Sequence, residues 1–364
     1  MNIYRTYRPR TFAEVAGQEH IKRTLQNEIA TGTLVHAYIF SGPRAVGKTT
    51  TARLVTRAIN CLSRNEGDSE PCNACDACMG ILGNKTLDVI EIDAASHTGV
   101  DNVRENIISA ARVGRAGLMW KVFIIDEVHM LSTSAFSALL KILEEPPSNV
   151  LFILATTELH KVPATVVSRC QRFDFKKIPP DAMRARLEHI CSLEKKKVDA
   201  SVLDAIVRLS GGCQRDAESL LDQVLSLDEN HIDMEKATRV LPIGSLELVK
   251  KFVSSVIGKD AKEALHALDS AIENGIDVGV LCADIVEFLR TALLIKAGAK
   301  DLIAESDHEI QERDALCAPV SEAEILALLE YLLAAQRDMR YASLSQLPLE
   351  IAIAKMCGVL PQTS

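Results

Sequence analysis

The chain is poor in aromatic residues, which make up 4% of its 364 residues and include a single tryptophan. Its cores must therefore be built from aliphatic side chains, and a hydrophobic content of 48% supplies them. No uninterrupted apolar run reaches the roughly 20 residues that cross a bilayer. The start MNIYRTYRPRTF lacks the apolar segment of a signal peptide. We expect a cytoplasmic protein of two or three domains with no membrane contact.

An excess of positive charge is also absent, because the formal net charge is −8 at pH 7. A chain of this charge does not coat nucleic acid as a polycation. Any contact with DNA must come from a local patch or from an assembly, and Arg104 and Arg112 are weak candidates because scattered arginines are usually only solvated.

Residues 1–178 alternate short apolar runs with segments of helical spacing. The runs HAYIFSG, LDVIEID, KVFIIDE and NVLFILATT predict strands at 36–42, 87–93, 121–127 and 149–157. Strands that are apolar on both faces and separated by helices are typical of a parallel sheet in an α/β domain.

The remainder of the chain predicts helices. Pro179 and Pro180 mark a linker to a small helical domain at 179–242, and residues 242–244 mark a second boundary. Leucine and alanine stripes then continue at helical spacing, which predicts an all-α domain at 243–364.

A phosphate-binding loop follows the first predicted strand. Gly42, Gly47, Lys48 and Thr49 satisfy G-x-x-x-x-G-K-[ST] in the stretch SGPRAVGKTT. Backbone N–H groups of such a loop hold a polyphosphate, the lysine brings positive charge to it, and the threonine hydroxyl reaches Mg²⁺. The sequence therefore predicts a nucleotide site, which also includes Pro43, Arg44, Ala45, Val46 and Thr50.

Two carboxylates follow the third predicted strand. KVFIIDE delivers Asp126 and Glu127 to the end of an apolar run. Asp126 suits a magnesium site and Glu127 is placed to activate water for attack on the γ-phosphate. Adjacent carboxylates also occur at exposed turns, so the catalytic interpretation depends on the phosphate loop upstream.

Ten cysteines in a chain of this size suggest metal binding where they cluster. Cys61, Cys72, Cys75 and Cys78 have the spacing C-x10-C-x2-C-x2-C, which matches a closed, structural zinc module at about 61–80. Free or redox-active thiols are the alternative, and nothing else in the sequence supports an iron–sulfur role. The six isolated cysteines are interpreted as small buried residues.

The stretch TVVSRCQRFDF places Arg169 and Arg172 after an apolar run. From the residues alone, both are typical of a solvated surface loop.

Several motifs together resemble one family. They are YRPRTFAEVAGQEH, IEIDAASHTGVDNVRE, IIDEVHMLSTSAFSALLKILEEPP, ATTE, SRC and SGGCQRDAESLLDQ. The chain resembles the gamma/tau subunits of the bacterial DNA polymerase III clamp loader, which are AAA+ ATPases. The match covers residues 4 to about 225 and, more loosely, the helical remainder.

The resemblance implies further site residues. Tyr7, Arg8, Pro9 and Val15 match the segment that surrounds the adenine of ATP. Thr157 matches a polar sensor beside the γ-phosphate. Arg215 matches a second sensor, carried by a small helical lid. Arg169 matches an arginine finger that acts in trans on a neighbouring subunit, whereas Arg172 stays a surface residue.

The resemblance also implies partners. The last helices match a collar that joins copies of the chain to delta-type and delta-prime-type subunits, and the ring opens a sliding clamp and loads it onto primer–template DNA. Such a chain hydrolyses ATP within the polymerase holoenzyme without polymerising DNA. A longer tau form, which would also bind polymerase and helicase, carries further domains, so the chain corresponds to a short form or to part of a longer one.

Three departures from the family pattern stand out. Ala45 occupies a loop position that is usually glycine, Ser137 replaces a common asparagine, and Cys213 with Gln214 replaces a Ser-Leu pair. If position 45 needs a positive φ, alanine costs roughly 1 kcal/mol there. No catalytic group is lost. The rival interpretations are another AAA+ machine, such as a DNA motor, and a ring scaffold that binds nucleotide without hydrolysing it.

Overall fold

The computed structural model describes residues 3–96, 107, 109–113, 115–227, 229–241, 245–299, 302–303, 307–339 and 341–359. The chain divides into two compact units, Met1–Met234 and Glu235–Ser364. The first unit contains the predicted sheet domain and most of the small helical domain expected at 179–242. Residues 242–244, the second predicted boundary, lie outside the described residues.

A five-stranded parallel sheet forms the centre of the first unit. Its strands run in the order β2 (Val89–Asp93), β3 (Lys121–Asp126), β4 (Val150–Thr156), β1 (Ala37–Ser41) and β5 (Gln171–Asp174). The four predicted strands are β1 to β4, which confirms the parallel α/β core. Strand β5 was not predicted, because it lies at the sheet edge and Phe173 is its only buried residue.

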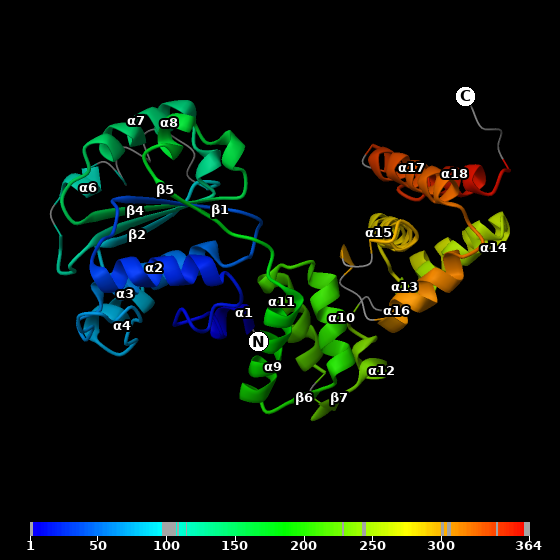
Figure 1. Ribbon diagram of the computed structural model, residues 1–364, viewed down its shortest axis with the longest axis horizontal. Coiled ribbons are helices and arrows are strands. Elements are labelled where there is room, and N and C mark those ends of the chain that lie inside the picture. The colour runs from blue at the N-terminus through cyan, green and yellow to red at the C-terminus, as the bar shows by residue number, and fades with distance from the viewer. Residues whose placement is uncertain are drawn as a thin grey trace. The chain divides into compact units, whose positions relative to one another are not determined.

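Alternating side chains of the central strands supply two separate cores. Ile39, Phe123 and Phe152 point to one core, which α7 (Thr133–Glu144) and α8 (Ala164–Val167) cover. Tyr38 and Phe40 point to the other core, which α2 (Glu19–Thr31) and α3 (Lys48–Asn60) cover. Figure 1 shows these helices on opposite faces of the sheet. Burial on both faces explains why the central strands read as continuous apolar runs.

The strand order decides which loops meet. Strand β4 lies between β1 and β3, and its last residue, Thr156, pairs in register with Ser41 at the end of β1. On the other side of β3, Asp93 pairs with Asp126. Because all strands are parallel, the loops after β1, β3 and β4 gather at one edge of the sheet.

Further helices belong to the first unit. They are α1 (Ile3–Thr6), α4 (Asp76–Leu82), α6 (Ala110–Arg112), α9 (Pro180–Leu193), α10 (Ala200–Ser210), α11 (Gln214–Leu225) and two 3-10 turns, Val128–Met130 and Leu159–Lys161. Helix α12 (Met234–Ala237) begins at the division between the units. A two-stranded parallel pair of β6 (Lys197–Val198) and β7 (His231–Ile232) was not predicted. Proline opens α9, and Gly211 ends α10 in the left-handed conformation.

The second unit is helical in its described residues. Its helices are α13 (Ser245–Ile257), α14 (Ala261–Glu273), α15 (Val278–Lys296), α16 (Asp307–Cys317), α17 (Glu322–Asp338) and α18 (Leu347–Met356). Leu281, Leu332 and Leu349 belong to one aliphatic core. Asp260 and Asp277 cap α14 and α15 through their side chains. Within the described part of the chain, every helix is too short or too polar to span a membrane.

Candidate nucleotide site and metal centre

The loop after β1 is built on three left-handed or otherwise unusual backbone positions. Gly42, Ala45 and Gly47 take φ values of 142°, 58° and 102°. A side chain on Gly42 would overlap the carbonyl oxygen of Phe175, so glycine is required there. Ala45 does occupy a position with positive φ, so it carries the cost of roughly 1 kcal/mol that the sequence predicted.

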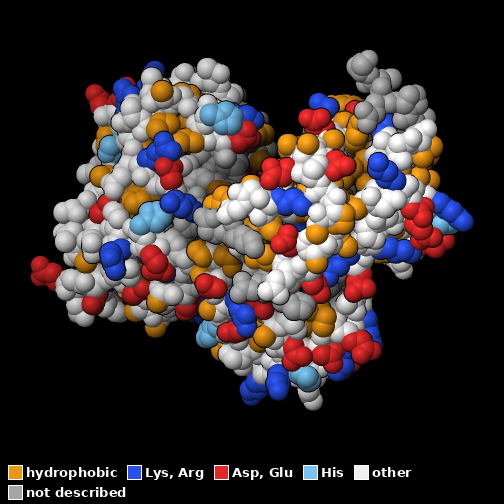
Figure 2. Space-filling model, turned by 45° about the vertical axis from the view of Figure 1, so that its right-hand side comes forward, with side chains coloured by type: hydrophobic (Ala, Val, Ile, Leu, Met, Phe, Trp, Pro, Cys, Tyr) orange, Lys and Arg blue, Asp and Glu red, His pale blue; other side chains and the backbone are white. Residues whose placement is uncertain are grey.

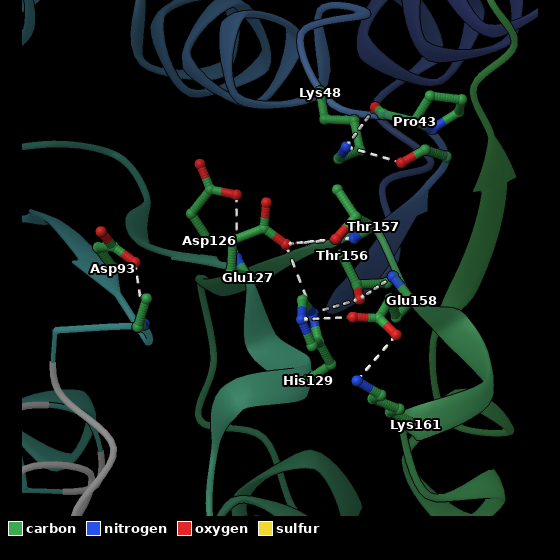
Figure 3. A network of polar contacts seen from close by, with 12 residues as sticks. Pro43, Lys48, Asp93, Asp126, Glu127, His129, Thr156, Thr157, Glu158 and Lys161 are labelled. Carbon is green, nitrogen blue, oxygen red and sulfur yellow. Dashed lines mark hydrogen bonds and ion pairs between the residues drawn. The ribbon is translucent and has the colours of Figure 1, made fainter. Parts of the chain in front are cut away.

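Lys48 begins helix α3 and closes this loop. Its Nζ donates to the carbonyl oxygens of Gly42 (2.8 Å) and Pro43 (2.7 Å), as Figure 3 shows. The side chain is buried, and this burial lowers the pKa of its ammonium group, while Glu127 and Asp126 oppose that shift. The lysine therefore lies at the loop's centre, where an anion would restore its usual pKa.

Thr49 and Asp126 meet beside this lysine. The Thr49 hydroxyl donates to Asp126 Oδ2 over 2.7 Å, although the two residues are 77 positions apart. A hydroxyl and a carboxylate are oxygen ligands of the kind that Mg²⁺ prefers. The pairing predicted between the phosphate loop and the end of β3 is thus present as a direct contact.

Glu127 turns from the end of β3 towards the end of β4. It takes a φ of 47°, and its Oε2 accepts from the backbone N–H (3.2 Å) and the hydroxyl (3.0 Å) of Thr157. His129 Nδ1 lies 3.4 Å from the same oxygen. Figure 3 shows the carboxylate between these two partners. The residue predicted as a sensor therefore touches the residue predicted to activate water.

His129 extends this network, although it was not predicted from the sequence as a site residue. Its buried ring has Nδ1 at 3.0 Å from Thr156 Oγ1 and Nε2 at 3.5 Å from Glu158 Oε1. Glu158 also pairs with Lys161 at 2.8 Å. The only sequence signal was a histidine two positions after the carboxylate pair, a spacing that also fits a surface turn.

A cavity of about 390 Å³ opens over the phosphate loop, a size that suits a nucleotide. Its lining includes most of the predicted residues, namely Arg8, Pro9, Val15, Arg44, Ala45, Val46, Gly47, Lys48, Thr49, Thr50, Asp126, Glu127 and Arg215. Residues that were not predicted as site residues also line it, namely Tyr4, Glu14, Ala16, Ile178, Arg186, Gln214, Asp216 and Glu218. Tyr7, Gly42, Pro43, Thr157 and Arg169 are not among the described lining residues.

Two buried charges stand on the helical side of the cavity. Glu218 on α11 and Arg186 on α9 are 4% and 8% exposed. Arg186 Nε lies 3.8 Å from Glu218 Oε1, and Gln214 Nε2 donates to the same oxygen over 2.9 Å. Burial raises the pKa of the Glu218 carboxyl to about 7. The backbone N–H of Gln214 donates to the Ala45 carbonyl (3.1 Å), which joins α11 to the phosphate loop.

The predicted sensor Arg215 lies against the N-terminal helix. Its guanidinium carbon is 4.6 Å from the centre of the Tyr4 ring, and Nη2 is 3.4 Å from the Tyr4 hydroxyl. Tyr7, predicted beside adenine, donates from its hydroxyl to Glu194 over 2.6 Å. Arg215 thus lines the cavity from the helical side.

Arg169 lies just beyond α8. Its guanidinium pairs with Glu144 Oε1 at 2.7 Å and donates to the Thr165 carbonyl over 2.7 Å. The side chain is 35% exposed. Arg172, predicted as a surface residue, is exposed on β5 and pairs with Asp174.

The four clustered cysteines do come together. The Sγ atoms of Cys61, Cys72, Cys75 and Cys78 lie within 4.8 Å of one another. A tetrahedral zinc–thiolate centre needs sulfur atoms about 3.8 Å apart, so the cluster fits the ion with a small contraction. N–H groups of Ala74 and Cys75 donate to Cys72 Sγ and lower the pKa of that thiol to about 6, whereas burial raises the pKa of Cys78.

Two weaker sequence predictions remain. The one on the isolated cysteines needs correction, and the one on the arginines lies partly outside the described residues. Among the isolated cysteines, Cys191, Cys282, Cys317 and Cys357 are buried, but Cys170 and Cys213 are only half-buried because each lies beside a surface loop. Arg104 lies outside the described residues, and Arg112 is the last residue of α6.

Comparison with known proteins shows which families and relatives the chain is similar to. Residues 17–179 match the family model described as DNA polymerase III, delta subunit, and residues 232–363 match DNA polymerase III subunits gamma and tau domain III. The chain is 38% identical to DNA polymerase III subunit tau of Bacillus subtilis over 100% of its own length and 64% of the relative's. It is 33% identical to DNA polymerase III subunit tau of Escherichia coli over 99% of its length and 56% of the relative's.

Solved structures give looser matches. The K64R mutant of Thermotoga maritima RuvB is 16% identical with a TM-score of 0.49, and the match covers 74% of this chain and 86% of that chain. The Bacillus subtilis DNA clamp loader delta protein is 13% identical with a TM-score of 0.42, over 92% of this chain and 99% of its own.

The curated relatives are longer, so the chain spans about three fifths of their length. Two family models match separate parts of the chain, and the alignment to the curated relatives runs through nearly all of it. The chain therefore belongs to the gamma/tau family of DNA polymerase III subunits.

Proposed function

We propose that the chain is an ATPase subunit of a bacterial sliding-clamp loader, in which ATP binding and hydrolysis drive the opening and loading of the clamp on primed DNA. The observation that carries the proposal is the Thr49–Asp126 contact of 2.7 Å beside Lys48, at the floor of a cavity that also contains Glu127. This is the constellation that phosphoryl transfer to water requires.

Each residue at the phosphate end has a task in this proposal. Loop N–H groups and Lys48 hold the β and γ phosphates, while Thr49 and Asp126 are the residues that would hold Mg²⁺, which neutralises phosphate charge when it is bound. Glu127 takes a proton from the attacking water as the new P–O bond forms and the bond to the ADP oxygen breaks. Thr157 orients Glu127 through the two hydrogen bonds that join them.

Arginines complete the site from two directions. Arg215 contacts the phosphates from the small helical lid, so nucleotide binding changes the angle between the lid and the sheet domain. Arg169 leaves Glu144 and reaches the γ-phosphate held by a neighbouring subunit. Its partly exposed position after α8 and its weak surface ion pair support this role. Fingers supplied in trans are worth 10³–10⁵-fold in rate.

The cysteine cluster is a structural zinc site in this proposal. All four ligands are cysteines, so no position stays open for a reacting water. Cys61 lies at the end of α3 and the other three cysteines surround the start of α4, so zinc joins the insertion to the helix that follows the phosphate loop.

The contact with DNA is to its backbone and is independent of sequence. On the face drawn in Figure 2, the described acidic and basic side chains are interspersed, which agrees with a net charge of −8. A ring of several subunits, rather than one basic surface on this chain, supplies the groove for primer–template DNA.

The helical second unit, which includes the predicted domain at 243–364, serves as the collar. It joins copies of this chain to delta-type and delta-prime-type subunits around the sliding clamp. The hydrophobic core of its described residues lets it fold as a separate body that holds the ring together.

Steady-state ATP hydrolysis tests the proposal. The wild-type chain, assembled with partner subunits, clamp and primed DNA, should hydrolyse ATP, and Glu127→Gln should bind ATP normally while turnover falls by about 10²–10⁴-fold. Equal turnover in the two proteins would rule out Glu127 as the base, and absence of hydrolysis in the wild type would favour a non-catalytic scaffold.

A clamp-binding assay separates a loader from a DNA motor of the same fold. We expect ATP-dependent affinity of the assembled ring for the sliding clamp. A ring that translocates on DNA without such affinity would support the motor.

A further inference from the structure

The N-terminal segment, residues 3–16, forms one wall of the cavity. Arg8, Pro9, Glu14 and Val15 line it. The start of the segment is fixed to the helical lid, because the Tyr7 hydroxyl donates to Glu194 and the Tyr7 carbonyl accepts from Arg186. The lid therefore holds one end of this wall.

The other end of the segment is held by Glu70. This residue belongs to the insertion that carries the cysteines and stands two positions before Cys72. Its Oε2 accepts from the backbone N–H of Phe12 (2.8 Å), and its Oε1 accepts from that of Ala13 (3.3 Å). Gln26 on α2 also donates to Oε1 over 3.1 Å. One carboxylate thus fixes two consecutive amides of the segment and a helix beneath it.

Asn73 adds a second connection from the same insertion. It lies between Cys72 and Cys75 in the left-handed conformation, with a φ of 57°. Its Nδ2 donates to the Arg10 carbonyl over 2.9 Å and to the Pro71 carbonyl over 3.2 Å. The loop that presents the thiols is therefore hydrogen-bonded to the same segment.

A short path joins these contacts to the cavity. Phe12 is fully buried, and its carbonyl accepts from the N–H of Val15 over 3.2 Å. Val15, which lines the cavity, is held on its other side by Lys22 Nζ, 3.0 Å from its carbonyl. A shift of Phe12 must therefore move Val15 or break this turn.

We infer that the cysteine-bearing insertion positions the N-terminal wall of the nucleotide cavity, with Glu70 as the main positioning residue and Asn73 as the second. The inference rests on the proposed function in its use of ATP as the ligand. It assigns the insertion a task inside its own subunit. Hydrogen bonds to a carboxylate are stronger than those between neutral groups. Loss of the Glu70 carboxylate should therefore displace the N-terminal wall of the cavity.

The test compares Glu70→Ala and Glu70→Gln with Glu66→Ala, a neighbouring exposed glutamate of the same insertion. Glu70→Ala should raise the Kd for ATP and the KM about five- to tenfold while kcat in the assembled loader stays within about twofold. Glu70→Gln keeps one accepting oxygen and should recover part of the affinity. Glu66→Ala should behave as wild type. Zinc content should stay unchanged in each variant, and thermal melting should show that each variant is folded.

Hydrogen exchange on the peptide that spans residues 8–16 separates the two proposals, because it needs no nucleotide. Faster exchange in Glu70→Ala than in Glu66→Ala supports the positioning role even in a protein that binds no ATP, a result that would overturn only the proposed function. Unchanged exchange, or wild-type KM and Kd in Glu70→Ala, would overturn the inference.

Discussion

The cavity has two sides that are built in different ways. The phosphate side comes from short sequence motifs at the ends of the parallel strands β1 and β3, and Thr49 and Asp126 contact each other directly there. The helical side comes from residues scattered through the chain, such as Tyr4, Arg186 and Glu218, which meet only through tertiary packing.

This difference separates the residues that carry out the chemistry, on the phosphate side, from those that position the nucleotide, on the helical side. The parallel strands fix the positions of the residues on the phosphate side, because the register between neighbouring strands determines where each strand ends. The helical side depends on a few long-range polar contacts, including the one between the buried Glu218 and the buried Arg186, whose Nε makes no hydrogen bond. Loss of the charged side chains on the phosphate side should therefore abolish activity, whereas changes on the helical side should alter affinity and stability.

The largest expected effect comes from Lys48→Ala. Removing the ammonium group leaves the phosphates without their buried positive charge, and affinity for ATP should fall at least about a hundredfold. Equilibrium binding of a fluorescent ATP analogue measures this. Because the lysine also pairs with the loop carbonyls, thermal melting must show that the variant is folded. Binding within threefold of wild type would contradict the role.

Arg215→Ala should have a smaller effect on the helical side. A charge-assisted contact to phosphate is lost, so ATP affinity should fall about tenfold. Arg215→Lys keeps the positive charge but not the planar stacking on Tyr4. Its affinity for ATP should therefore lie between those of the wild type and Arg215→Ala. Equal affinity in all three proteins, measured by calorimetry, would show that Arg215 is a surface residue.

Glu218→Gln tests the buried pair through pH. The pKa of this carboxyl is about 7 in the folded chain against 4.5 for the free group, so its burial costs stability as pH rises through that window. The variant should be more stable than wild type by up to about 3 kcal/mol near pH 8, with the gain vanishing as pH falls towards 4.5.

Urea denaturation at both ends of the range measures this gain. Glu188→Gln on the exposed face of α9 is the matched control and should change little at either pH. A Glu218→Gln gain that is equal at both pH values would show that packing, rather than ionisation, sets the effect.

The smallest expected effect is that of Ala45→Gly. Glycine tolerates the φ of 58°, so the variant should gain about 1 kcal/mol, or roughly 2–4 °C in melting temperature. Gly42→Ala in the same loop should lose stability because its Cβ overlaps the Phe175 carbonyl. Calorimetry that shows no gain for Ala45→Gly would mean that the loop relaxes around alanine.

The sequence predicted the phosphate side because its motif has fixed spacing and lies beside long apolar strands. Asp126 and Glu127 could be placed because a buried strand determines where its last residue points. Strand β5 was not predicted because Phe173 is the only buried residue in it, which leaves no periodic hydrophobic pattern to detect.

The helical side could not be predicted for a related reason. Glu218 and Arg186 lie on amphipathic helices, where charged residues are usually solvated, and no local signal shows that they face each other in the interior. His129 was missed similarly, since its contacts with Thr156 and Glu158 depend on β4 lying beside β3.

The most direct test of the central claim is ATP hydrolysis by the assembled loader with clamp and primed DNA, comparing wild type with Arg169→Ala. Turnover should fall by about 10³-fold or more while ATP binding stays normal, because the arginine acts on a neighbouring subunit's nucleotide. Wild-type turnover in Arg169→Ala, or a loss of turnover that is matched by a loss of ATP binding, would contradict the account.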